Sequence, residues 1–228
     1  MRWHRPAKIA FIGSHGIRKT TAAHAFASTV QRAGRSVEYG REVVRDSPFA
    51  INEAATGEAQ LWVLVSQIRQ ELELGRRAEV LVLDRGVMDN FAYYLRATGG
   101  ADPFAVEPLV RAWSATYDLV VRLIPDLALR ADGIRSMSDA FRDAIERILD
   151  ERLASYVSPD RTIVIRASAV GEGFDWWPVA ERLAAIVGEP LLAPGVSPPS
   201  RPRQRRPDRP PKGTPSQLPL KLPSDPGG

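Results

Sequence analysis

Cysteine is absent from the 228 residues of this chain, and only three histidines are present. Without cysteine there can be no disulfide, no thiol nucleophile and no cysteine-ligated zinc or iron–sulfur site. So few histidines also argue against a metal site built on imidazole. These absences favour a cytoplasmic protein whose chemistry relies on other side chains.

Long hydrophobic runs are also missing. No segment reaches the roughly 18 apolar residues that a membrane-spanning helix needs. The apolar stretch at residues 7–13 is too short for a signal-peptide core, and no small-residue cleavage region follows it. We therefore expect a soluble protein that is neither secreted nor in contact with a membrane, with one well-buried domain and an appendage.

The formal charge of +4 is unevenly distributed along the chain. From Gly195 onward, seven basic and two acidic residues carry a net charge of +5, so the preceding body is near −1. Ten of the 19 prolines lie between Pro198 and Pro226. We expect a folded domain at residues 1–189 and a disordered, Pro/Arg-rich tail at 190–228. Nucleic acid is a possible partner only through this tail, because a near-neutral body lacks the charge pattern of a DNA-binding domain.

Short apolar segments alternate with helical patterns along the body. Strands are expected at residues 8–12, 36–39, 79–84, 118–124 and 161–165, and helices at 20–32, 58–75, 137–156 and 177–187. Parallel strands joined by helices form a sheet that is covered on both faces, with ligands at the carboxyl ends of the strands. The sequence therefore predicts a three-layer α/β/α fold with a mostly parallel five-stranded sheet.

The first strand leads into a glycine loop that reads GSHGIRKT and then into a helix. This loop matches the P-loop pattern G-x-x-x-x-G-K-[ST] at every fixed position except the second glycine. In such a loop backbone N–H groups surround phosphates, the lysine reaches the β and γ groups, and the hydroxyl binds Mg²⁺. A glycine-rich turn with a surface lysine is the alternative. The predicted nucleotide-binding residues are Gly13, Ser14, His15, Gly16, Ile17, Arg18, Lys19, Thr20 and Thr21.

Arg18 stands where the pattern has its second glycine. Its side chain could crowd the space that the backbone and the phosphate share, which would reduce function. Alternatively, the guanidinium could point outward, or toward the phosphates as an extra cationic contact. The residue type alone leaves these interpretations open.

A second constellation, Asp84-Arg85, ends the apolar third strand, and Asp89 and Asn90 follow at the start of the next helix. At that strand end a carboxylate lies beside the loop after the first strand and can hold Mg²⁺ or its water. The adjacent arginine can neutralise phosphate charge. A helix cap with a surface ion pair is the alternative.

Two further groups are weaker candidates. Glu42, with Arg45, follows the second strand, and its carboxylate could accept a proton from an acceptor hydroxyl; the alternative is a helix-surface pair. The segment 132–135 ends in Arg135 and precedes a helix that carries Arg142. An arginine on such a segment could close over a triphosphate, although a turn with solvated charges would look the same.

Taken together, these motifs resemble the P-loop ATP-binding domains related to thymidylate kinase and to the nicotinamide riboside kinase module of NadR proteins, an AAA-type ATP-binding domain. The resemblance covers about residues 7–187. It rests on the segments 13–21, 42–48, 58–71 with Trp62, Gln67 and Glu71, 83–93 and 132–135.

The resemblance implies that the protein binds ATP and Mg²⁺ and transfers a phosphoryl group to a nucleoside-like or small hydroxyl acceptor. It would make Lys19 the phosphate lysine, Thr20 and Asp84 the metal ligands, and Arg85 the strand-end arginine. Glu42 would be the candidate base and Arg135 a lid arginine. The chain departs from the family pattern at Arg18 and at Gly86, where a serine or threonine is usual.

The leading hypothesis is therefore an ATP-dependent small-molecule kinase. A catalytically weakened nucleotide-binding regulatory module, with Arg18 as the cause, is the alternative. A nucleic-acid-associated ATPase that uses the basic tail is a third hypothesis. The sequence does not identify the acceptor or the oligomeric state.

Overall fold

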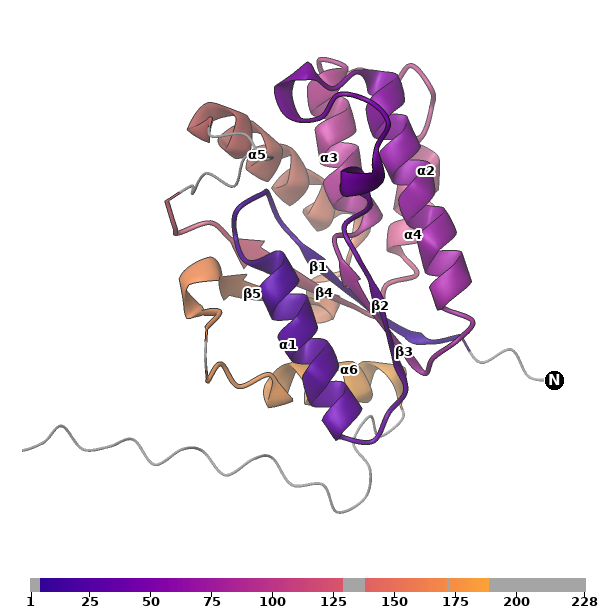
Figure 1. Ribbon diagram of the computed structural model, residues 1–228, viewed down its shortest axis with the longest axis vertical. Coiled ribbons are helices and arrows are strands. Elements are labelled where there is room, and N and C mark those ends of the chain that lie inside the picture. Colours follow the sequence, from indigo (N-terminus) through magenta and orange to yellow (C-terminus); the bar gives the residue numbers. More distant parts are fainter. Residues whose placement is uncertain (1–4, 129–137, 172, 189–228) are drawn as a thin grey trace, which may run out of the picture. The chain divides into compact units, whose positions relative to one another are not determined.

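The computed structural model describes residues 5–128, 138–171 and 173–188 (Figure 1). The strands are β1 (Ala7–Ile12), β2 (Val37–Gly40), β3 (Val80–Asp84), β4 (Leu119–Ile124) and β5 (Thr162–Arg166). The helices of these residues are α1 (Lys19–Arg32), α2 (Gly57–Leu74), α3 (Val87–Ala97), α4 (Glu107–Ser114), α5 (Asp139–Tyr156) and α6 (Trp177–Val187). The expected tail at 190–228 lies outside the described residues. No described helix is both long enough and apolar enough to cross a membrane.

The five strands form one sheet in the order β2-β3-β1-β4-β5, and each pair of neighbouring strands is parallel. Helices α1 and α6 cover one face, and α2 to α5 cover the other (Figure 1). The predicted three-layer α/β/α fold is confirmed. Because all carboxyl ends of the strands lie at one edge, the loops after β1, β2 and β3 meet there.

One element was not predicted: the crossover between β3 and β4 contains α4 in addition to α3. Only the start of α3 was expected from the sequence. Helix α4 has eight residues, and only Val110 and Ser114 of these are buried. Its two turns are shorter than the window of about 11 to 18 residues over which helical periodicity can be recognised.

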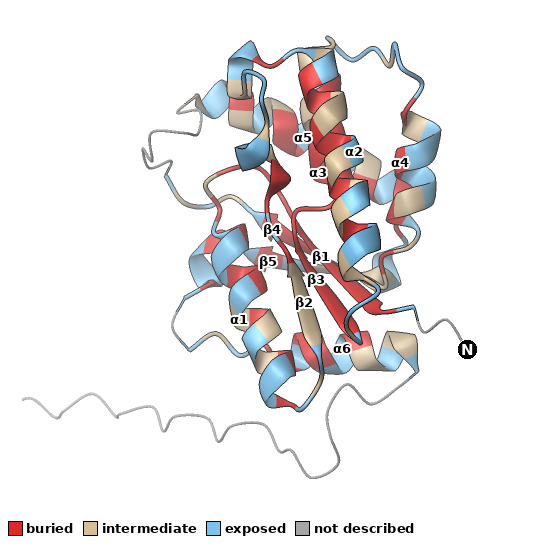
Figure 2. Ribbon diagram, turned by 45° about the vertical axis from the view of Figure 1, so that its right-hand side comes forward, coloured by how far each residue is buried: buried red, intermediate tan, exposed pale blue. Residues whose placement is uncertain are grey.

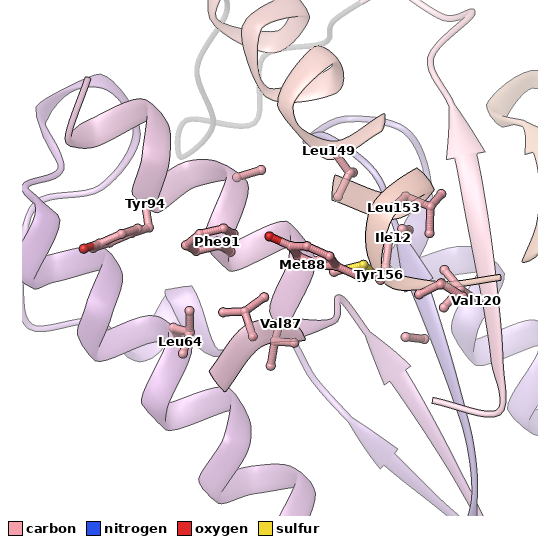
Figure 3. Packing of buried hydrophobic residues seen from close by; sticks show 14 of the residues in the cluster. Ile12, Leu64, Val87, Met88, Phe91, Tyr94, Val120, Leu149, Leu153 and Tyr156 are labelled. Atoms are coloured by element: carbon pink, nitrogen blue, oxygen red, sulfur yellow. The ribbon is translucent and has the colours of Figure 1, made fainter. Parts of the chain in front are cut away.

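Side chains of alternate strand residues enter two separate cores. Ile9 and Phe11 of β1 pack toward α1 and α6, whereas Ala10 and Ile12 pack toward the opposite layer. The central strands are buried on both faces (Figure 2). In the second core, Ile12 and Val120 of the sheet belong to the cluster that also contains residues of α3 and α5 (Figure 3). This packing fixes the strand ends that carry the site.

Helix α1 begins differently from α2 and α5. The Thr56 hydroxyl accepts a hydrogen bond from the Ala59 amide at the start of α2, and Ser138 does the same for Phe141 at the start of α5. The residue before α1 is Arg18, whose side chain caps nothing. The first amides of α1 therefore have no capping partner, which suits a helix end that faces an anion.

A buried polar network below the site centres on Glu71 of α2. Its carboxylate accepts hydrogen bonds from Lys8 Nζ at 3.1 Å, Trp113 Nε1 at 2.8 Å, Tyr117 Oη at 2.9 Å and Gln67 Nε2 at 3.1 Å. The Glu71 side chain is fully buried and that of Lys8 is 9% exposed. Since a buried charge needs its partners, this network constrains how α2 sits on β1.

We predict that Glu71→Gln destabilises the fold by about 3 kcal/mol, because it leaves the Lys8 ammonium buried without a carboxylate. Glu73→Gln is the matched control on the same helix, since Glu73 pairs with Arg69 in an exposed position. The control should change the free energy of unfolding by less than about 0.5 kcal/mol. Urea denaturation of both variants measures the difference, and equal losses would contradict a special role for Glu71.

Candidate functional site

The loop between β1 and α1 follows a path that only glycine permits at its first position. Gly13 has φ = +147°, and a Cβ there would lie 2.7 Å from the carbonyl oxygen of Leu123. Gly16 also has a positive φ, of 77°. The chain can therefore curl tightly over the end of β1 before α1 begins at Lys19.

Two buried carboxylates hold the first amides of this loop. Asp89 of α3 accepts a hydrogen bond from the Gly13 amide at 2.8 Å and another from the Gly86 amide at 2.9 Å. Glu146 of α5 accepts one from the Ser14 amide at 2.7 Å. The loop is thus fixed to α3 and to α5.

The charges of these carboxylates are balanced differently. Burial raises the pKa of Asp89, although Lys19 and Arg85 oppose this shift. Burial would also raise the pKa of Glu146, but the Arg122 guanidinium, 2.5 Å away, holds that pKa below its usual range. Sequence reasoning missed Glu146 and Arg122, because a single carboxylate within α5 and a single arginine within β4 form no local motif.

Lys19 lies inside the curl of the loop. It is 6% exposed, and its ammonium donates a hydrogen bond to the Ser14 carbonyl oxygen. Burial, reinforced by the nearby Arg85 guanidinium, lowers its pKa from 10.5 to about 8. The lysine is therefore a desolvated cation, and an added anion would stabilise its charged form.

Thr20 and Asp84 come together at the other side of the loop. The Thr20 hydroxyl donates to Asp84 Oδ2 at 2.6 Å, and the Tyr39 hydroxyl donates to the same oxygen at 3.2 Å. Asp84 is in register with Phe11 on the neighbouring strand, which places it beside the loop. Burial and Asp84 together raise the pKa of Tyr39, so Tyr39 remains a proton donor here.

The Arg18 side chain points away from the curl of the loop. Its Nη1 donates a hydrogen bond to the carbonyl oxygen of Val170 at 2.6 Å, in the segment between β5 and α6. Its backbone is left-handed, with φ = 63° and ψ = 25°, a conformation that glycine adopts without cost. The sequence left three interpretations of Arg18 open, and in the structure its guanidinium points outward.

Arg85 and Glu42 form a buried ion pair. Arg85 Nη2 lies 2.5 Å from Glu42 Oε1, and Arg45 Nε lies 3.2 Å from Glu42 Oε2. The Arg85 guanidinium is also 5.1 Å from the centre of the Tyr93 ring. Burial alone would lower the pKa of Arg85, but Glu42 holds it well above its ordinary value. A permanently charged arginine therefore lies next to the predicted base.

Two cavities have Glu42 and Arg45 among their lining residues. The first, which we call the P-loop cavity, is lined by Gly16, Ile17, Arg18, Lys19, Thr20, Thr21, Asp84, Glu42 and Arg45. The second, which we call the side cavity, is lined by residues that include His15, Gln60, Arg85, Asn90 and Tyr93, and again by Glu42 and Arg45. Glu42 and Arg45 therefore face both spaces.

The remaining sequence candidates fall elsewhere. The segment 132–135 with Arg135 lies outside the described residues. Arg142 of α5 pairs with Asp139 on its own helix at 2.8 Å and donates to the Leu127 carbonyl oxygen at 3.2 Å. The predicted residues that the structure does bring together are Lys19, Thr20, Glu42, Asp84 and Arg85.

A solved structure shares this fold. A structure described as NadR protein in complex with NAD and AMP-PNP superposes with a TM-score of 0.54 at 13% identity, over 81% of this chain. The chain spans about half of that protein, since 50% of the NadR chain is covered. A deoxyadenosine kinase from M. mycoides with bound dATP gives a TM-score of 0.48 at 14% identity, covering 71% of this chain and 91% of the kinase. A search of curated protein sequences found no significant match.

The family comparison covers most of the domain. A family model described as an AAA domain matches residues 8–167, from β1 to the end of β5. This range includes the P-loop, the Asp84-Arg85 pair and both carboxylates that hold the loop. The chain therefore belongs to this AAA-domain family, and it shares the fold of the NadR structure.

Proposed function

We propose that this protein is an ATP-dependent small-molecule kinase, which transfers the γ-phosphoryl group of ATP to a hydroxyl of a nucleoside-like acceptor. The observation that carries the proposal is that Glu42 and Arg45 line both cavities. A polyphosphate over the P-loop and a hydroxyl compound in the side cavity would be neighbours there. Such proximity supplies a large part of the rate in phosphoryl transfer.

The donor would be held by the loop and by Lys19. Unpaired amides at the start of α1 suit phosphate oxygens, and the desolvated ammonium of Lys19 adds charge. A donor of the ATP type is also supported by the AMP-PNP in the NadR complex.

Thr20 and Asp84 are the residues that fit Mg²⁺. Their hydroxyl and carboxylate oxygens lie 2.6 Å apart, and oxygen is the ligand type that Mg²⁺ prefers. Within the described residues no group of three or more His, Asp or Glu side chains could hold a metal. Two protein ligands suit an ion that shares its coordination with phosphates and water. When bound, Mg²⁺ would neutralise charge on the β and γ phosphates.

Glu42 and Arg85 would act on the acceptor side. In the proposed reaction the acceptor oxygen bonds to the γ-phosphorus, and the bond from that phosphorus to the β–γ bridging oxygen breaks. The proton of the hydroxyl passes to Glu42, and ADP leaves. Arg85, already charged and fixed by Glu42, would stabilise negative charge on the transferring group. From the family resemblance, Arg135 would close over the triphosphate.

Turnover with a panel of acceptors tests the function. We expect ADP release from Mg·ATP that depends on a nucleoside-like hydroxyl compound, and Lys19→Met should lower it at least about 100-fold by removing the phosphate cation. A coupled ADP assay gives the rate, and Mg·ATP-induced thermal stabilisation reports binding. If the protein shows no turnover and no thermal stabilisation at millimolar Mg·ATP, the proposal is refuted. Binding without turnover would favour the regulatory alternative.

The base is tested by Glu42→Gln. Without a proton acceptor, kcat should fall by about 10²-fold or more, while the Kd of Mg·ATP changes little. Glu38→Gln on β2 is the matched control, because Glu38 lies four residues before Glu42 in the sequence and lines neither cavity. Steady-state kinetics and a donor titration separate the two effects. An unchanged kcat for Glu42→Gln would remove Glu42 from the reaction.

Donor binding should take up a proton near pH 8, because Lys19 has a pKa of about 8 in the free protein. The polyphosphate raises this pKa, so uptake should be about 0.1 proton at pH 7 and about 0.9 at pH 9. Affinity should consequently fall as pH rises above 8. Calorimetry in two buffers of different ionisation enthalpy measures the uptake.

The matched control is Lys19→Arg, since arginine stays charged throughout this range. It should bind the donor without this proton uptake. Equal uptake by both proteins would assign the proton to another group.

A further inference from the structure

The start of the P-loop is packed against the end of β4. A Cβ on Gly13 would lie 3.1 Å from Arg122 Nη1 and 2.7 Å from the Leu123 carbonyl oxygen. Arg122 is in register with Ile12, the last residue of β1, and it is 2% exposed. Its Nη1 donates a hydrogen bond to the Leu123 carbonyl oxygen at 2.7 Å. A buried guanidinium therefore lies directly beside the loop that we expect to enclose the phosphates.

Two carboxylates of α5 balance the charge of this guanidinium. Arg122 Nη2 lies 2.5 Å from Glu146 Oε2 and 2.8 Å from Asp150 Oδ1. The Asp150 side chain is 64% exposed, so solvent screens its charge, whereas the Glu146 side chain is 12% exposed. A buried charge is costly when its partner is missing. Arg122 and Glu146 are therefore the buried pair of this cluster.

Ser14 connects this pair to the lysine of the P-loop. The Ser14 amide donates to Glu146 Oε1 at 2.7 Å, and the Ser14 carbonyl oxygen accepts the hydrogen bond from Lys19. Ser14 itself is fully buried. The Glu146 carboxylate and the Lys19 ammonium thus hold the two polar backbone groups of one residue. An unbalanced carboxylate in this position would repel a polyphosphate that Lys19 attracts.

We propose that Arg122 is a positioning residue for the donor: by neutralising Glu146, it lets a carboxylate hold the Ser14 amide without a net negative charge beside the bound polyphosphate. Arg122 lines neither cavity, so it acts through Glu146 and not by contact with phosphate. The inference rests on the donor site of the proposed function. It adds to that site a cation that lies outside the P-loop motif.

The pKa of Glu146 is consistent with this role. Burial would raise the pKa, but the Arg122 charge and the Ser14 hydrogen bond hold it below its usual range. Other ionisable groups of the surrounding elements belong to the P-loop, to α3 and to α5 itself: His15, Lys19, Asp89, Tyr93, Arg96, Arg142, Asp143 and Asp150. These groups are the same in the variants of Arg122 and Glu146. Comparison with the unaltered protein at each pH therefore isolates the pair.

Arg122→Met removes the charge and keeps a long side chain. Without the guanidinium, burial raises the pKa of Glu146, so the carboxylate is charged above this pKa and neutral below it. The Kd of Mg·ATP should exceed that of the unaltered protein at least about tenfold near pH 7.5. This ratio should fall to about threefold or less near pH 5.5, because the carboxylate takes up a proton. Calorimetric titrations across this pH range measure the ratio.

The double variant Arg122→Met/Glu146→Gln is the matched rescue. The glutamine oxygen can still accept the Ser14 amide, and no charge is left to balance. The Kd of Mg·ATP should return to within about threefold of the unaltered value at every pH. If the double variant binds as weakly as Arg122→Met, Arg122 supports the loop only through packing and the inference is overturned.

Two further variants keep the test informative if Arg122→Met does not fold, which circular dichroism of the free protein reports. Glu146→Gln leaves Arg122 paired with Asp150 and removes the negative charge beside the site, so Mg·ATP should bind about threefold more tightly. Asp150→Asn is the control, because Asp150 is exposed and lines neither cavity. Its Kd should change by less than about twofold. Unchanged or weaker binding by Glu146→Gln, or an equal gain in both variants, overturns the inference.

The pH profile gives a further decisive outcome. A Kd ratio for Arg122→Met that is the same at both ends of the pH range overturns the inference, since a titrating carboxylate is the proposed cause. If the unaltered protein does not bind Mg·ATP, the proposed function fails, and this inference with it. If the unaltered protein binds Mg·ATP but the variants behave in one of the contrary ways, the inference alone is refuted.

Discussion

The site depends on two buried carboxylates that hold the first two amides of the P-loop. Asp89 and Glu146 approach from α3 and α5 and fix Gly13 and Ser14. Their negative charge lies close to where a polyphosphate would bind, and this arrangement is tolerable only because Lys19, Arg85 and Arg122 are nearby. These contacts within the chain order the start of the loop. The conformational entropy of this part is therefore lost on folding and not on ligand binding.

Much of this architecture could be predicted from the sequence because its signals are local. Apolar runs located the five strands, and helical periodicity located most helices. The spacing between Gly13 and Thr20 identified the P-loop, and the position of Asp84 at a strand end placed it beside that loop. The structure adds that Thr20 and Asp84 are hydrogen-bonded.

The missing parts depend on contacts between distant residues. Glu146 lies 132 residues from Ser14, and Val170 lies 152 residues from Arg18. No local pattern predicts which carboxylate will reach a given amide, or which carbonyl a guanidinium will find. For the same reason the sequence left the orientation of Arg18 open, since the outcome depends on where the Val170 carbonyl oxygen lies.

The ion pair of Arg85 and Glu42 is connected to the core of the domain. Arg85 also has a left-handed backbone, with φ = 89°, and its carbonyl oxygen lies 3.4 Å from Gln67 Nε2. Gln67 in turn donates to Glu71, the centre of the buried network below the site. The strained turn at the end of β3 is therefore supported from the core, as expected where strain persists at a site. Because Glu42 is held by Arg85, and the Arg85 carbonyl oxygen accepts a hydrogen bond from Gln67, the position of Glu42 depends on the packing of α2 as well as on the loops.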